Sequence, residues 1–230
     1  MVPSPSVSPE RGRAGASAQQ EYERRAARRE ERVRARYPRL GGLILALVDE
    51  PAHTRVWAQG ARGERAVAAK LDDLSPEHVE VLHDRSMRRP DGRLSKANID
   101  HIVVAAIGVW VVDAKTHHGR LEVRRDGGIL RARTERLFIA GRDKTSLLDG
   151  LARQVDAVRT QLEAVDAPVQ VRGALCFVGT ELPWFGENIG DVPLVGRRGL
   201  GKILKRDGDL TAEERTVVAA YLADRFPAAP

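Results

Sequence analysis

The sequence predicts an α/β fold in which a mixed central sheet is flanked by helices. The predicted elements follow the order helix, three or more strands, helix, strand, helices, which is typical of a sheet covered by helices. Two strand segments, 98–104 and 109–115, are apolar on both faces and therefore belong in the middle of a covered sheet. With 230 residues, 42% of them hydrophobic, the chain is long enough for one well-packed domain with appendages.

The first 40 residues are predicted to form a charged N-terminal arm outside this domain. Residues 1 to about 18 are rich in Pro, Ser, Gly and Ala, a composition that predicts disorder. Residues 19–37 are rich in Arg and Glu and predict a helix with too few apolar positions for a packed face. This helix is either solvated or docks to a protein partner, and its interleaved charges favour a solvated network over a DNA-binding arm. A connecting segment over 41–59 follows, with an apolar patch at 43–48.

Residues 60–180 are predicted to form the core of the domain. A helix over 61–74 carries Val67, Leu71 and Leu74 on one face. The remaining core elements are a short strand at 79–82, strands at 98–104 and 109–115, a hairpin of 119–124 and 129–133 with its tip at 126–128, a long helix at 144–165 and a strand at 169–178. Residues 181–230 supply a loop at 183–190 and two closing helices, 199–205 and 211–225.

Composition restricts the environment and the partners of the chain. Cys176 is the only cysteine, so no intramolecular disulfide or zinc-finger site can form, which fits a reducing compartment. No apolar run approaches the roughly 20 residues of a membrane span, and residues 1–9 lack the apolar centre of a signal peptide, so we expect a cytoplasmic protein without membrane contact. The formal charge of +6 and the pI of about 9.9 permit binding to a polyanion such as nucleic acid without proving it.

The two central strands each carry a buried acid, Asp100 and Asp113. Charged groups in apolar strands are costly unless they are paired or bind a metal. If Val104 pairs with Val109 in a hairpin, Asp100 lies directly opposite Asp113 on the same face, with Cβ atoms about 5 Å apart. Opposed carboxylates repel each other unless a divalent cation lies between them. Lys115, two residues beyond Asp113, projects from the same face.

A third acid, Glu64, stands at the start of the apolar, sheet-facing stripe of the first core helix. Three carboxylates and a lysine that face one point have the composition of a site for Mg²⁺- or Mn²⁺-dependent phosphodiester hydrolysis. The metal polarises the phosphate and lowers the pKa of a bound water. The lysine orients that water, stabilises charge on the transition state or acts as base.

These residues also resemble a known family. The runs Gly60-Ala61-Arg62-Gly63-Glu64, Asn98-Ile99-Asp100-His101 and Gly108-Val109-Trp110-Val111-Val112-Asp113-Ala114-Lys115, followed by Gly119, resemble the nuclease-related domain, NERD, a branch of the PD-(D/E)xK nuclease superfamily. The resemblance implies a restriction-endonuclease-like core, with Glu64, Asp100 and Asp113 as metal ligands and Lys115 as the catalytic lysine. It also implies a supporting role for Gln154, which resembles the helix glutamine of the family. Asp113 stands where Glu is more usual and Asn98 where Gln is more usual.

Further polar residues have two interpretations. His101 points away from Asp100 and is expected to be structural. His117 and His118 either contact phosphate or metal or are solvated loop residues, and the solvated alternative is favoured. Arg142, Lys144 and Arg153 form either a phosphate-contacting surface or a solvated helix start. The predicted function is metal-dependent cleavage of nucleic acid, with DNA as the expected substrate. The alternative is a nuclease-like module that binds nucleic acid or a protein partner without cleaving.

Overall fold

The structure of the chain is a computed structural model that describes residues 10–36, 52–75, 77–88, 92–128, 131–184 and 186–229. Its helices are α1 (Ala16–Arg36), α3 (Ala52–Asp72), α4 (Ser146–Glu163), α5 (Arg197–Leu204) and α6 (Ala212–Arg225). Its strands are β1 (Val79–Arg88), β2 (Leu94–Ala105), β3 (Gly108–Gly128), β4 (Arg131–Ile139), β5 (Arg142–Asp143), β6 (Val171–Glu181), β7 (Glu187–Ile189) and β8 (Val192–Gly196).

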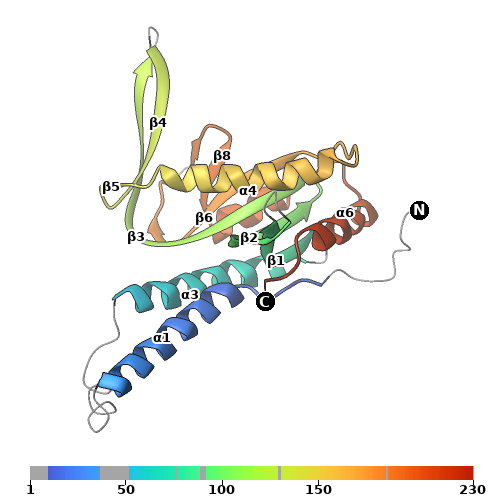
Figure 1. The fold of residues 1–230 in the computed structure, drawn as a ribbon. Helices are drawn as coiled ribbons and strands as arrows, with labels where there is room; N and C mark the ends of the chain where they lie inside the picture. The colour runs from blue at the N-terminus through green and yellow to red at the C-terminus, as the bar shows by residue number, and fades with distance from the viewer. Residues whose placement is uncertain are drawn as a thin grey trace.

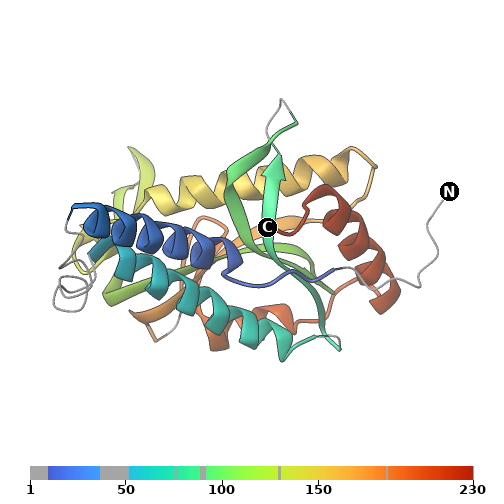
Figure 2. The same ribbon diagram turned by 60° about the horizontal axis from the view of Figure 1, so that its bottom comes forward.

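The predicted α/β fold with a mixed sheet is confirmed. The strands pair in the order β1-β2-β3-β6-β8-β7, and β4 and β5 extend β3 off this path. Neighbours β1, β2 and β3 are antiparallel, whereas β3 with β6 and β6 with β8 are parallel. Helices α4 and α6 cover one face of the sheet, and α3 and α5 cover the other (Figures 1 and 2).

The central strand β3 is apolar on both faces, as expected. Val109 and Val111 belong to the hydrophobic cluster under α4 and α6, while Trp110 and Val112 belong to the cluster under α3 and α5. All four side chains are buried. This double burial explains why the segment lacks the polar alternation of a half-exposed strand.

The predicted pairing of the two central strands is also confirmed. Val104 pairs with Val109, and the register continues to His101 opposite Val112. The connection is tighter than the predicted four-residue loop, because Ala105 and Gly108 pair and leave a two-residue turn.

Strand β3 runs further than predicted, through a bulge into a long ribbon with β4. The pairing with β6 shifts between Thr116 and Gly119, and Gly119 has a φ of 95° that favours glycine. The sequence predicted two separate strands here and a partner strand that ended at residue 133, whereas β4 runs Arg131–Ile139. Leu137 and Ile139 extend it because both are buried in the cluster under α4.

The N-terminal residues that the structure describes are ordered against the domain. The backbone N–H of His83 donates to the carbonyl of Arg11 at 2.6 Å, and α1 packs along α3 (Figure 2). A Cβ at Gly15 would lie 3.2 Å from the carbonyl oxygen of Ala61, so glycine permits this close approach. The disorder predicted from composition is therefore wrong for residues 10–18.

The helix predicted at 61–74 begins earlier, at Ala52, within the predicted connecting segment. The patch at 43–48 and residues 1–9 lie outside the described residues. Among the helices that the structure describes, none is long and apolar enough to cross a membrane.

Candidate active site

The two predicted acids lie where strands β2 and β3 part. The pairing of these strands ends at His101 and Val112, after which β3 stays with β6, where Asp113 pairs with Leu175. The backbone N–H of Ala114 donates to Oδ2 of Asp100 at 2.8 Å. The carboxylate of Asp100 thus reaches the backbone of β3 two residues beyond the last pair of the ladder.

Lys115 forms an ion pair with the second acid, Asp113. Its Nζ donates to Oδ1 of Asp113, and the side chain of Asp113 is 5% exposed against 27% for Lys115. Burial lowers the pKa of Lys115, but the negative charges of Asp113 and Asp100 and the hydrogen bond to Asp113 outweigh burial and raise it above its ordinary value. The lysine is therefore an ammonium ion at neutral pH, aimed at the acid pair.

The pKa of Asp100 is shifted by burial and by its charged neighbours. Burial raises its pKa well above the ordinary value, and the neighbouring Asp113 raises it further, against a smaller lowering by Lys115. A side-chain hydrogen bond with Asp113 acts in the same direction, since it favours the protonated form. The two carboxyl groups therefore lie together, as the predicted register requires.

Glu64 comes to this cluster from α3. Burial raises its pKa to about 7, Asp84 and Asp113 raise it as well, and Lys115 lowers it. Its position follows from the neighbouring glycine, because a Cβ at Gly63 would lie only 1.9 Å from Oγ1 of Thr116 in β3. The absence of a side chain at residue 63 lets α3 approach β3 closely, next to Glu64.

Asp84 is a fourth acid of this neighbourhood, which the sequence analysis missed. It is buried in β1 with a φ of 47°, and its carboxylate accepts hydrogen bonds from the backbone N–H of Ser17 at 2.8 Å and the Ser17 hydroxyl at 2.9 Å. The side chain of Asn98 donates to it at 3.1 Å. The signal in the sequence was the polar run His83-Asp84-Arg85, which ended the predicted strand at residue 82 although β1 continues to Arg88.

Gln154, for which a supporting role is predicted, contacts β2 close to Asp100. Its Nε2 donates to the backbone carbonyl of Asn98 at 3.2 Å, so α4 is tied to β2 two residues before Asp100. Its Oε1 is buried and has no hydrogen-bond partner among the described residues. The amide therefore retains an acceptor for a further hydrogen bond.

The histidines form two groups, one buried between β1, β2 and α3 and one at the bulge of β3. His101 is fully buried on the α3 side, where its Nδ1 lies 2.9 Å from Nδ1 of His83, and Nε2 of His83 lies 3.1 Å from Oδ1 of Asp72. Burial lowers the pKa of His101 and of His83. His117 and His118 form the bulge in β3, and Nε2 of His118 lies 2.6 Å from Nε2 of Gln59. His101 thus has the structural surroundings expected of it.

The basic residues near the start of α4 have no hydrogen bond or ion pair with Asp100 or Asp113 among the described residues. Arg142 and Arg153 are exposed, and Lys144 is half-buried and lowers the pKa of His117, after the larger effect of burial. The alternatives for these side chains, a phosphate-contacting surface or a solvated helix start, both remain predictions.

The cluster of Glu64, Asp100, Asp113 and Lys115 is not arranged as a ready metal-binding site. Within the described parts of the chain, no three His, Cys, Asp or Glu side chains are grouped so that they could hold a metal ion. One oxygen of Asp100 is engaged by the N–H of Ala114, and one oxygen of Asp113 is engaged by Lys115. The cluster has the charge and the donor type of a divalent-metal site, arranged around an ammonium ion.

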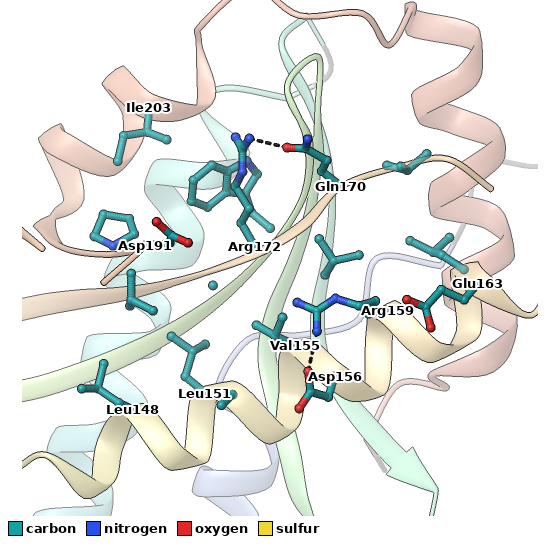
Figure 3. Close-up of a pocket in the computed structure, with 18 of the residues that line it drawn as sticks. Leu148, Leu151, Val155, Asp156, Arg159, Glu163, Gln170, Arg172, Asp191 and Ile203 are labelled. Carbon is teal, nitrogen blue, oxygen red and sulfur yellow. Dashed lines mark hydrogen bonds and ion pairs between the residues drawn. The ribbon is translucent and has the colours of Figure 1, made fainter. Parts of the chain in front are cut away.

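A cavity of about 1000 Å³ lies elsewhere, between α4 and the beginning of β6 (Figure 3). None of the clustered acids lines it. Two polar contacts join lining residues: Arg159 donates to Asp156 at 2.6 Å, and Arg172 donates to Gln170. The cavity therefore lies outside the candidate active site.

The nuclease-related domain, NERD, matches residues 59–178 of the chain, just over half of its length. The chain belongs to the NERD family. The NERD match contains Glu64, Asp100, Asp113, Lys115 and Gln154, so the cluster built by β2, β3, α3 and α4 lies wholly inside the shared region.

A second comparison gives a more limited relationship. An uncharacterized protein of Bacillus anthracis is 37% identical over 67 residues, which cover 29% of this chain and 30% of that protein. No solved structure matches the chain.

Proposed function

We propose that this NERD protein has a PD-(D/E)xK-type core and is a Mg²⁺- or Mn²⁺-dependent nuclease that hydrolyses phosphodiester bonds in DNA. The observation that carries the proposal is that Asp100 and Asp113 lie together at the point where β2 and β3 part, with Lys115 donating to Asp113. Strand pairs do not need such a group of charges, and perturbed carboxyl groups of this kind are typical of catalytic sites.

The donor set fits a hard divalent cation. Asp113 raises the pKa of both Asp100 and Glu64, Glu64 raises that of Asp100, and Lys115 lowers both, so the cluster gathers several carboxyl groups around one ammonium ion. These three carboxylates are the residues that would hold the ion, and oxygen ligands suit Mg²⁺ and Mn²⁺. When bound, the ion supplies polarisation of the phosphate and a lower pKa of a bound water.

The side chains of the chain itself have separable tasks in this proposal. The Lys115 ammonium, positioned by Asp113, stabilises the negative charge that develops on the phosphate or orients the attacking water. Gln154 fixes the backbone of Asn98 and with it the approach of β2 to the site. The formal charge of +6 assists the binding of a polyanionic substrate.

The test is cleavage of double-stranded DNA, single-stranded DNA and RNA in Mg²⁺, Mn²⁺ or EDTA. Lys115→Ala should reduce the cleavage rate on the order of 100-fold or more while binding stays nearly unchanged. Lys202→Ala, at an exposed position of α5, is the matched control and should leave both unchanged. Metal-independent cleavage, or a Lys115→Ala variant that cleaves normally, would contradict the proposal.

A second function remains a candidate because the described residues contain no group of three side chains ready to hold a metal. In this alternative the protein is a nuclease-like module that binds nucleic acid or a protein partner without cleaving it. Wild-type protein that binds nucleic acid but cleaves none of the three substrates with either metal would establish it.

A further inference from the structure

The ribbon formed by residues 119–139 of β3 and β4 extends from the body of the domain. Figure 1 shows it rising past the beginning of α4 and away from the rest of the described chain. Side chains alternate between its two faces. On the inner face, four apolar side chains join the hydrophobic cluster under α4: Leu121, Val123, Leu137 and Ile139.

The opposite, outer face of the ribbon is arginine-rich. It consists of Arg120, Glu122, Arg124, Arg136 and Phe138. Arg124 and Arg136 are direct partners across the strands, and their guanidinium carbons lie 3.8 and 5.5 Å from the centre of the Phe138 ring. Like charges placed directly opposite destabilise a strand pair, so this arrangement is not explained by sheet formation.

The partners of these two arginines leave them accessible. Arg124 lies 3.5 Å from Glu122, and Arg136 pairs with Asp143. The Arg124 and Arg136 side chains are 52% and 54% exposed, and exposed ion pairs contribute only about 0–1 kcal/mol. A polyanion can therefore compete for both guanidinium groups at little cost.

Arg125, also in the ribbon, differs from Arg124 and Arg136 in its partners. Arg125 points to the inner side, where it contacts Glu135 at 2.8 Å, Glu187 at 2.5 Å and the carbonyl of Asn188 at 3.0 Å. Its charge is neutralised by two carboxylates and has a structural use between the ribbon and β7. The outer arginines share one aromatic ring and have fewer anionic partners.

We propose that the outer face of the ribbon binds the phosphate backbone of a nucleic-acid duplex that reaches the candidate active site, an inference that rests on the proposed function. The same strand, β3, carries both Lys115 and Arg124, at most about 30 Å apart at 3.3 Å per residue. That separation corresponds to about nine base pairs, and a duplex is stiff over this length. A two-stranded ribbon also has the dimensions that enter a major groove.

The experiment compares two double variants with equal loss of positive charge. Arg124→Gln/Arg136→Gln alters the outer face, while Arg159→Gln/Arg225→Gln removes exposed charges from α4 and α6, outside the ribbon. Affinity for a duplex of about 20 base pairs is measured by fluorescence anisotropy against salt concentration. Two lost phosphate contacts should reduce the salt slope by about two and weaken binding about 60-fold at 0.1 M salt. The control should bind like wild type.

Several outcomes would overturn the proposal. These are an unchanged slope in the ribbon variant, an equal loss in the control, or a ribbon-dependent affinity for single strands as high as for the duplex. Thermal unfolding of each variant shows whether it is folded. Arg124→Gln alone keeps the ion pair of Arg136 with Asp143 and should lower the salt slope by about one.

Cleavage separates this proposal from the proposed function. If wild type cleaves no substrate but the ribbon variant loses duplex affinity, the nuclease proposal fails and the ribbon surface stands. If wild type cleaves and the ribbon variant binds duplex equally well, only the ribbon proposal fails.

Discussion

Replacement of Glu64 by glutamine should make the metal-free protein more stable at neutral pH. Burial raises the pKa of Glu64 from an ordinary 4.5 to about 7, with Asp84 and Asp113 adding to the effect. Between these two pH values the folded protein retains a proton that the unfolded chain has lost. The contribution of Glu64 to stability is therefore lost progressively as the pH rises from about 4.5 to 7.

The size of the effect follows from the shift in pKa. Each pKa unit corresponds to about 1.36 kcal/mol, so a change from 4.5 to about 7 corresponds to about 3 kcal/mol. Glutamine has nearly the same shape but cannot ionise. Glu64→Gln should therefore match wild type near pH 4.5 and exceed its unfolding free energy by up to about 3 kcal/mol at pH 8.

The assay is urea unfolding in EDTA at a series of pH values between 4.5 and 8. Wild type, Glu64→Gln and Glu163→Gln are compared, since Glu163 is an exposed residue at the end of α4 and tests the substitution itself. His83 and His101 give stability a pH dependence of the opposite sign. Because all three proteins contain both histidines, this contribution cancels when the proteins are compared. Burial lowers the pKa of both, so their contribution is full at high pH and is lost as the pH falls.

Added Mg²⁺ provides a second, independent readout. A cation that binds the ionised cluster should stabilise wild type by about 2.7 kcal/mol at a hundredfold excess over Kd, and the gap to Glu64→Gln should narrow. A difference between the two proteins that does not change with pH would refute the reasoning, because Glu64 would then be a solvated carboxylate outside the site.

Three further substitutions test the support of the site. Asp100→Asn should leave the metal-free fold as stable or slightly more stable, because it removes repulsion from Asp113. Calorimetric titration of this variant should show weaker Mg²⁺ or Mn²⁺ binding, and unchanged affinity would exclude ligation by Asp100. Ser17→Ala should lower the unfolding free energy by about 1–3 kcal/mol, because the Asp84 carboxylate loses the hydroxyl donor, and a loss below about 0.5 kcal/mol in urea unfolding would show that the arm does not anchor there. Gln154→Met should reduce kcat with little change in KM, since its amide holds the backbone near the acids, and normal kcat would leave Gln154 without a role.

The sequence was sufficient where local rules determine the geometry. The register of Val104 opposite Val109 followed from a period of two and a short connection, and it correctly brought Asp100 and Asp113 to one place. Lys115 followed from the same alternation. The prediction that Glu64 faces the sheet succeeded because helical periodicity is also a local property.

The sequence was insufficient where distant segments decide the outcome. Asp84 is buried in β1 because Ser17 and Asn98, far from it along the chain, donate hydrogen bonds to it. A Cβ at Gly12 would lie 2.3 Å from the carbonyl oxygen of His83, so the glycine permits docking of the arm. Neither contact leaves a periodic pattern, and the composition of residues 10–18 therefore resembled that of a disordered segment.

The architecture explains how a repulsive cluster persists in a stable domain. Two contacts hold its surroundings in place: Gln154 donates to the backbone carbonyl of Asn98, and Gly63 lies close to the side chain of Thr116. The acids themselves are engaged at single oxygens, by Ala114 and Lys115. The ammonium ion of Lys115 offsets part of the negative charge of the cluster, and the contacts of Gln154 and Gly63 do not involve the carboxyl groups, so the positions of β2 and α3 do not depend on the repelling acids.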